Sequence, residues 1–126
     1  MSSLIISKIH KVSAHGTTLY VTVPRSCYSI VSSASFLYAY IADNSIVYSV
    51  EPPAVAREGA VLVASDRIVL LPATMKSMVY RVRVAKVNSN ALALRIPAMF
   101  ARALRIDKSS YANVICYDSK IVVKVL

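Results

Sequence analysis

The stretch K-V-N-S-N-A-L-A-L-R-I-P-A-M-F-A-R-A-L-R-I, from Lys86 to Ile106, decides the fold that the sequence predicts. Large apolar side chains occupy every second position from Ala91 to Ile96, which predicts a half-buried strand with one face toward a core. Pro97 ends that strand and has the φ angle of a first helical turn. Apolar residues then recur at helical spacing up to Leu104, so a short amphipathic helix follows.

Two more β-rich runs, Tyr111 to Cys116 and Ile121 to Val125, flank the polar turn Tyr117-Asp118-Ser119-Lys120 and predict a hairpin. The order of strand, Pro-started helix and hairpin resembles the AbrB/SpoVT/MazE family of swapped-hairpin DNA-binding domains. The resemblance is carried by the residues quoted above and by Y-D-S-K-I-V-V-K, from Tyr117 to Lys124. The resemblance covers residues 80–126. It implies a mainly β fold with short helices, built as an AbrB-like swapped-hairpin β-barrel, that binds double-stranded DNA.

The first fifty residues repeat this pattern in degenerate form. Leu19 to Pro24 matches Leu92 to Pro97, and Asp43 to Val47 matches Asp118 to Val122. Lys11-Val12 is matched with Lys86-Val87, which places two extra residues in the first copy's loop around Ala14-His15-Gly16-Thr17. Because strand parity is kept, six apolar side chains are expected to face the core. They are Leu19, Val21, Val23, Leu92, Leu94 and Ile96.

A single unit of this size exposes edge strands and cannot close a core, so the repeat predicts a pseudo-two-fold barrel within one chain. Pairing between two chains as a homodimer is the alternative. We divide the chain into a first repeat (1–50), a linker (51–79) and a second repeat (80–126). The linker contains a further hairpin pattern, Ala60 to Val63 and Ile68 to Leu71, which either covers a sheet edge or docks another protein.

The chain is strongly basic and its charge is unevenly distributed. It has 15 Lys and Arg against 6 Asp and Glu, a net charge of +9. Residues 80–126 carry nine basic residues against Asp107 and Asp118, net +7, whereas residues 1–50 reach net +2 and residues 51–79 are balanced. The charge is therefore concentrated where the family resemblance lies, which favours a polyanionic partner.

The family resemblance also singles out candidate DNA contacts, because basic residues on its first strand, just before the Pro and in the following helix line its DNA-facing surface. Lys86, Arg95 and Arg102 fall at such places, and Lys11 and Arg25 are their nearest counterparts in the first repeat. Arginine suits phosphates and guanine edges because its planar fork donates two parallel hydrogen bonds. For any single residue the alternative is a solvated surface charge. The full candidate set is Lys8, Lys11, Arg25, Arg81, Arg83, Lys86, Arg95, Arg102 and Arg105.

Residue patterns for catalysis and for cofactors are absent from the sequence. The two histidines, His10 and His15, have no metal-ligand spacing to another His, Cys or Glu. The two glycines, Gly16 and Gly59, cannot form a phosphate-binding loop. We therefore expect no enzyme activity and no cofactor.

Apolar stretches of the chain are too short for a membrane span. The longest, residues 30–42 and 60–73, are interrupted by polar residues and fall below the roughly 18 to 20 apolar residues that a spanning helix needs. The N-terminus lacks the pattern of a secretory signal. We expect a cytoplasmic, nucleoid-associated protein of prokaryotic or viral origin, with no membrane partner.

Cys27 and Cys116 are isolated cysteines, and most such residues are unpaired buried hydrophobes. A disulfide between them would suit an oxidising compartment or the cytosol of a hyperthermophile.

The leading functional hypothesis is a DNA-binding transcriptional regulator of AbrB-like type. An antitoxin-like protein that binds a toxin is a second hypothesis, although residues 80–126 end directly after their hairpin without the tail that MazE-type antitoxins append. A third is a chromosome-coating protein without sequence preference.

Overall fold

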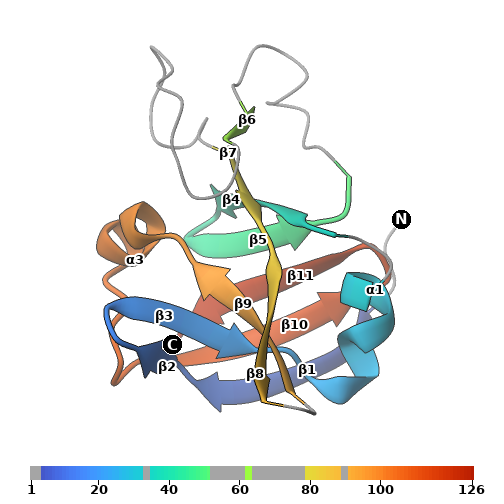
Figure 1. The fold of residues 1–126 in the computed structure, drawn as a ribbon, viewed down its shortest axis with the longest axis horizontal. Coiled ribbons are helices and arrows are strands. Elements are labelled where there is room, and N and C mark those ends of the chain that lie inside the picture. The colour runs from blue at the N-terminus through green and yellow to red at the C-terminus, as the bar shows by residue number, and fades with distance from the viewer. Residues whose placement is uncertain (1–3, 33–34, 52–61, 64–78, 89–90) are drawn as a thin grey trace.

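The computed structural model describes residues 4–32, 35–51, 62–63, 79–88 and 91–126. Two β-sheets lie one over the other, and short helices stand at both sides of them (Figure 1). The elements in chain order are β1 (Leu4–Lys11), β2 (Ser13–His15), β3 (Thr18–Thr22), η1 (Arg25–Cys27), α1 (Tyr28–Ser32), β4 (Leu37–Ala42), β5 (Ser45–Ser49), β6 (Leu62–Val63), β7 (Val79–Val82), β8 (Val84–Asn88), β9 (Ala91–Ile96), α3 (Ala98–Leu104), β10 (Tyr111–Tyr117) and β11 (Lys120–Val125). The predicted mainly β fold with short helices is confirmed.

One sheet has seven strands in the order β1-β10-β11-β5-β4-β7-β6, and the other has four in the order β2-β3-β9-β8. Every neighbouring pair is antiparallel except β6 and β7. No helix in the described ranges is long and apolar enough to cross a membrane.

The sheets do not join into one closed hydrogen-bonded barrel within the described ranges, so this part of the predicted fold is corrected. The chain passes from the seven-stranded to the four-stranded sheet at Val12, between β1 and β2, and again at Arg83, between β7 and β8. At each bend the strand leaves one ladder and enters the other, so hydrogen bonding is interrupted where a barrel would need it to continue.

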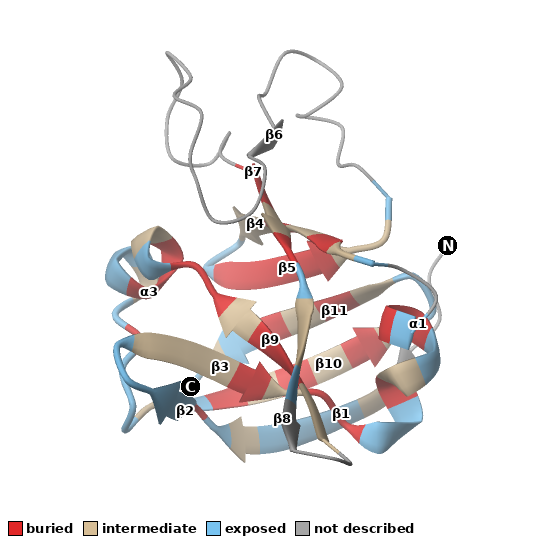
Figure 2. Ribbon diagram, in the orientation of Figure 1, coloured by how far each residue is buried: buried red, intermediate tan, exposed pale blue. Residues whose placement is uncertain are grey.

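The core lies between the two sheets, and buried residues line both inner faces (Figure 2). Of the six side chains predicted to face inward, Val21, Val23, Leu94 and Ile96 are buried. Leu19 and Leu92 are partly buried and pack against the same core cluster. The predicted strand parity is therefore correct.

β3 and β9 are the strands that match each other in the two repeats, and they pair so that exchanging the two repeats leaves the pairing unchanged. Leu19 lies opposite Ile96, and the Val23 N–H donates to the Leu92 carbonyl at 2.9 Å. Because Leu19 matches Leu92 and Val23 matches Ile96, each half of the chain makes the same pairing with the other half.

The same symmetry relates β5 and β11 in the seven-stranded sheet. Ile46 lies opposite Val123 and Tyr48 opposite Ile121. Outside this central pair, the hairpin of each half lies beside the first strand of the other half, since β10 pairs with β1 and β4 pairs with β7. The two halves are therefore interleaved rather than side by side.

The registers of β1 with β10 and of β7 with β4 show that the predicted match of Lys11-Val12 with Lys86-Val87 is wrong. His10 lies opposite Ala112 and Val82 lies opposite Leu37, and Ala112 and Leu37 hold equivalent places in the two hairpins. The counterpart of His10 is therefore Val82, and that of Lys11 is Arg83 rather than Lys86.

The predicted loop insertion is also wrong. Ser13 lies opposite Tyr20, and Ala85 lies opposite Ala93, the counterpart of Tyr20. The two turns span equal numbers of positions, since His15 pairs with Thr18 and Asn88 with Ala91, and the extra residue lies in β8, where the register shifts between Lys86 and Asn88. A bulge adds one residue to a strand and has no sequence pattern of its own. The two repeats were therefore aligned out of register in this strand.

Most of the predicted central hairpin lies outside the described residues. Within it, Leu62–Val63 forms β6 and pairs in parallel with the outer edge of β7.

A disulfide joins Cys27 in η1 to Cys116 in β10, and both residues are fully buried. The expected burial is confirmed, whereas the preference for unpaired thiols is wrong. Interleaving of the halves explains the contact, because it brings a strand of the second half beside the helical turn of the first across a sequence separation of 89 residues.

Leu94→Ala should lower the free energy of unfolding by about 2–5 kcal/mol, because Leu94 is fully buried between the sheets. Urea denaturation provides the measurement. Leu126→Ala is the control, since Leu126 is 65% exposed and its truncation should change stability by no more than about 0.5 kcal/mol. Equal losses in the two variants would contradict the position of the core.

Reduction of the disulfide should cost about 2–5 kcal/mol of stability, because the bond closes a long loop and thereby limits the unfolded chain. We expect denaturation midpoints to fall when dithiothreitol is added to the unaltered protein. The double variant Cys27→Ala/Cys116→Ala should have low stability with or without reductant. If dithiothreitol leaves the denaturation midpoint of the unaltered protein unchanged, the disulfide does not form.

Candidate nucleic-acid interface

The outer face of the four-stranded sheet presents two rows of side chains. Between them, Val21 and Leu94 point inward and are buried, so their neighbours along each strand point outward. One row crosses the sheet through Ser13, Tyr20 and Arg95, and the other through Thr22, Ala93 and Ala85. In the second row Ala93 is fully buried, and Thr22 and Ala85 are partly exposed.

Two exposed cations lie where the chain bends between the two sheets. Arg83 lies between β7 and β8, next to Val84, which pairs with Leu94 of β9. Lys11 is the last residue of β1 in the seven-stranded sheet, where it lies opposite Tyr111, and Val12 connects it to β2. Since Lys11 and Arg83 are counterparts in the two halves, each bend carries one exposed positive charge.

Arg95 is half-buried. It lies in the second strand from the sheet edge, opposite Tyr20 of β3. Its backbone is fixed from inside the molecule by Tyr48, whose hydroxyl donates to the Arg95 carbonyl at 2.9 Å. Complete burial raises the pKa of Tyr48, so the phenol keeps the proton that it donates.

The two helical segments place further cations beside this sheet. In α3, Phe100 and Ala101 face the core while Arg102 is exposed. The positions of Phe100 and Arg102 agree with the predicted amphipathic helix, whereas Ala103, expected on its apolar face, is exposed. Arg105 is exposed at the C-cap of α3 with φ 57°, a left-handed conformation that ends the helix. Arg25 is exposed at the start of η1. Figure 1 shows α1 and α3 on opposite sides of the four-stranded sheet.

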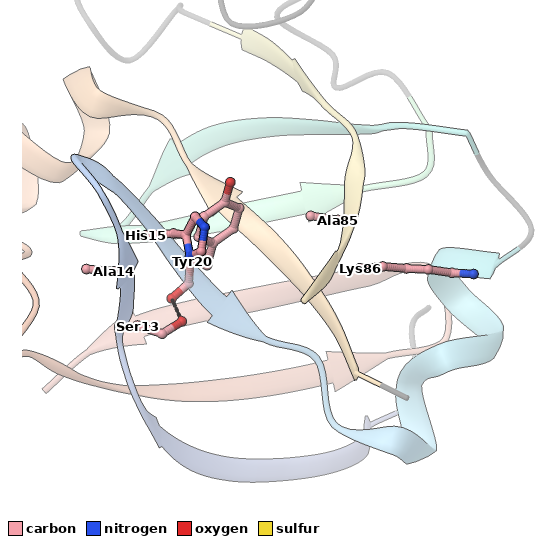
Figure 3. A pocket seen from close by; sticks show the side chains of 6 residues that line it. All are labelled: Ser13, Ala14, His15, Tyr20, Ala85 and Lys86. Atoms are coloured by element: carbon pink, nitrogen blue, oxygen red, sulfur yellow. Dashed lines mark hydrogen bonds between the residues drawn. The ribbon is translucent and has the colours of Figure 1, made fainter. Parts of the chain in front are cut away.

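A pocket of about 170 Å³ opens on the four-stranded sheet (Figure 3). His15 and Tyr20 stand close together there, and the Ser13 hydroxyl donates to the Tyr20 carbonyl at 3.4 Å. The exposed Lys86 side chain extends away from these groups. The pocket is lined by Ser13, Ala14, His15, Tyr20, Ala85 and Lys86. Reasoning from basic residues missed Ser13 and His15, and the strand alternation around Tyr20 is the one signal that could have indicated them.

Three of the nine predicted contacts belong to strands of the seven-stranded sheet. Arg81 is in β7, where its Cζ lies 3.9 Å from the centre of the Phe36 ring. Lys8 and Lys11 are exposed on β1, at the edge of the same sheet. The structure places the other six on the four-stranded sheet, at its flanking helices or at the bend that leads into it: Arg25, Arg83, Lys86, Arg95, Arg102 and Arg105.

Comparisons with protein-family models, with curated proteins and with solved structures found no match. In the described part of the chain, no three His, Cys, Asp or Glu side chains are grouped so that they could hold a metal ion. The functional argument for this chain therefore depends on its own geometry and charge.

Tyr48→Phe should cost about 1–3 kcal/mol of stability, because the Arg95 carbonyl loses a buried donor without any change in packing volume. Chemical denaturation checks the loss. Tyr111→Phe is the matched control, since Tyr111 is 51% exposed and water can replace its hydroxyl contacts. If both variants are as stable as the unaltered protein, the Tyr48 bond does not hold β9.

Proposed function

We propose that this chain is a DNA-binding transcriptional regulator of AbrB-like type, which binds double-stranded DNA through the outer face of its four-stranded sheet and the flanking helices. One observation carries the proposal. The described residues of β2, β3, β8, β9, η1, α1 and α3 include basic side chains from both halves and no Asp or Glu. The described carboxylates lie in turns and loops outside these elements, at Asp43, Glu51, Asp107 and Asp118.

The exposed cations suit a phosphate backbone. Each neutralised phosphate releases counterions, so affinity should depend steeply on salt. The half-buried Arg95, fixed by its backbone bond to Tyr48, is the cation best placed for a directional contact with a base edge, whereas the exposed Arg102 suits phosphate contacts. Pseudo-symmetric cations from the two halves match the two strands of a duplex.

The topology supports the family assignment within this proposal. Each hairpin lies beside the first strand of the other half, which is the arrangement that hairpin exchange between two copies would produce inside one chain. We infer an internal duplication of an AbrB-like unit with two open sheets. The buried disulfide favours a compartment or organism that keeps thiols oxidised.

Selection of bound sequences from random double-stranded DNA tests the function. Enrichment of a shared motif is expected for a regulator. Binding without enrichment at fixed salt would instead indicate a chromosome-coating protein, and no binding at low salt would leave the antitoxin-like alternative.

Arg95→Ala/Arg102→Ala should weaken DNA binding and reduce the slope of log affinity against log salt by up to about two units. Lys11→Ala/Arg25→Ala should have a smaller effect, because the second half carries more of the charge. Fluorescence anisotropy over a salt series measures both.

Lys120→Ala/Lys124→Ala is the matched control for these variants. It removes the same charge from β11 of the seven-stranded sheet, so a proposal based on the other sheet expects affinity to change little. If this control loses as much affinity as Arg95→Ala/Arg102→Ala, net charge rather than the four-stranded sheet determines binding.

A further inference from the structure

β1 is an edge strand of the seven-stranded sheet with one side open. The N–H of Val12, directly after β1, donates to the Ser110 carbonyl at 2.9 Å. This bond shows which residues of β1 direct their backbone groups toward β10, because that direction alternates along the strand. Since successive residues of an antiparallel strand direct their polar backbone groups to opposite sides, Ser7, Ile9 and Lys11 direct theirs to the open side. No described strand pairs with that side.

The counterpart edge in the other half is occupied. Lys8 corresponds to Tyr80 of β7, and β6 pairs there, with Leu62 opposite Val79 and Val63 opposite Tyr80. Pairing along this edge is thus geometrically accessible in this fold. The first half offers the same backbone groups without a described partner.

Exposed apolar side chains gather beside this open edge. The large hydrophobic residues that are exposed in the described ranges are Ile9 at 63%, Tyr111 at 51% and Leu126 at 65%. Tyr111 lies opposite Lys11, two positions along from Ile9, and the Leu126 N–H donates to its carbonyl at 3.0 Å. Ile9 is the one of these three that lies on the edge strand itself, and an exposed apolar side chain on an unpaired strand edge is typical of a protein interface.

We propose that two copies of this chain form a homodimer by antiparallel pairing of their β1 strands, centred on Ile9. A second copy is favoured because β1 is self-complementary in this register. Ile9 lies opposite its own copy and loses its exposure, while Lys11 lies opposite Ser7 and Lys8 opposite His10. Centring on Lys8 would bring two lysines together, and centring on His10 would set Ile9 against Lys11.

The dimer and the proposed DNA interface use different sheets, with Lys11 at the end of β1 as the one candidate DNA contact on the paired strand. β1 pairs through the edge of the seven-stranded sheet, whereas the proposed DNA interface is centred on the four-stranded sheet. The inference therefore does not depend on DNA binding, and oligomeric state is measured without DNA.

Sedimentation velocity of the full chain over a concentration series tests the pairing. A concentration-dependent dimer is expected, and Ile9→Lys should raise its dissociation constant by at least about tenfold, because it replaces a buried apolar contact by two facing charges. Leu126→Lys is the matched control. It makes the same charge change on an equally exposed residue two strands from the edge, so the dimer should persist.

A cysteine probe tests the register. The described cysteines, Cys27 and Cys116, are already bonded to each other, so Ile9→Cys adds a single reactive thiol. Directly opposed residues of a hydrogen-bonded antiparallel pair have Cα atoms about 5.5 Å apart, within disulfide range. Mild oxidation should convert Ile9→Cys to a covalent dimer and leave Lys8→Cys largely monomeric on a non-reducing gel.

A chain that is monomeric at all concentrations overturns the proposal, and the β1 edge would then be open to a different protein. Equal disruption by Ile9→Lys and Leu126→Lys, or equal cross-linking of the two cysteine variants, would also overturn the pairing centred on Ile9.

Discussion

Backbone hydrogen bonding between the two halves is the constraint on which the rest of the structure depends. β3 can complete its ladder only with β9, and β5 only with β11, and each partner comes from the other half. A half alone would expose these central strands as open edges with their apolar faces uncovered, and a unit of that size buries too little surface to compensate. Folding of either half therefore requires the other, and the shared core follows from that pairing.

The two halves attach their helical segments to the seven-stranded sheet in different ways. Cys27 and Phe100 are each the third residue after a proline that starts a helical segment. At the first site the side chain is bonded covalently to Cys116 of β10. At the second, Phe100 packs edge-on against Tyr80 of β7, with ring centres 4.9 Å apart. Each helical segment is thus attached to a strand of the seven-stranded sheet, by a covalent bond in one half and by an aromatic contact in the other.

Local patterns predicted the elements well, because alternation and proline placement act over a few residues. β9, the helix after Pro97 and the β10–β11 hairpin lie where the sequence placed them, and the inward parity of Leu94 and its neighbours is right. The bend at Arg83 could not be predicted, since neither Gly nor Pro marks it. Together with the bend at Val12 it explains why the barrel is open, and it also explains why Arg81 lies outside the candidate interface.

The candidate site was predictable in its chemistry and less so in its arrangement. Charge counts along the chain identified the basic residues. The half-burial of Arg95 could not be predicted, because it depends on the residues that β3 and β8 place beside it when they pair with β9. The bond from Tyr48 to its carbonyl joins the two sheets across the core, between residues 47 positions apart. The match of Lys11 failed because a bulge near Lys86 has no sequence signature of its own.

The disulfide has a topological consequence for the integrity of the chain. Because it joins Cys27 to Cys116, any single break of the backbone between these residues leaves one covalent molecule with two new ends. Among the described residues, the strand pairs that unite the halves lie outside the segment between β5 and β7, where β6 is the one described strand. A molecule cut in that segment would keep its paired central strands and its covalent tether, and would separate into two pieces only after both reduction and unfolding.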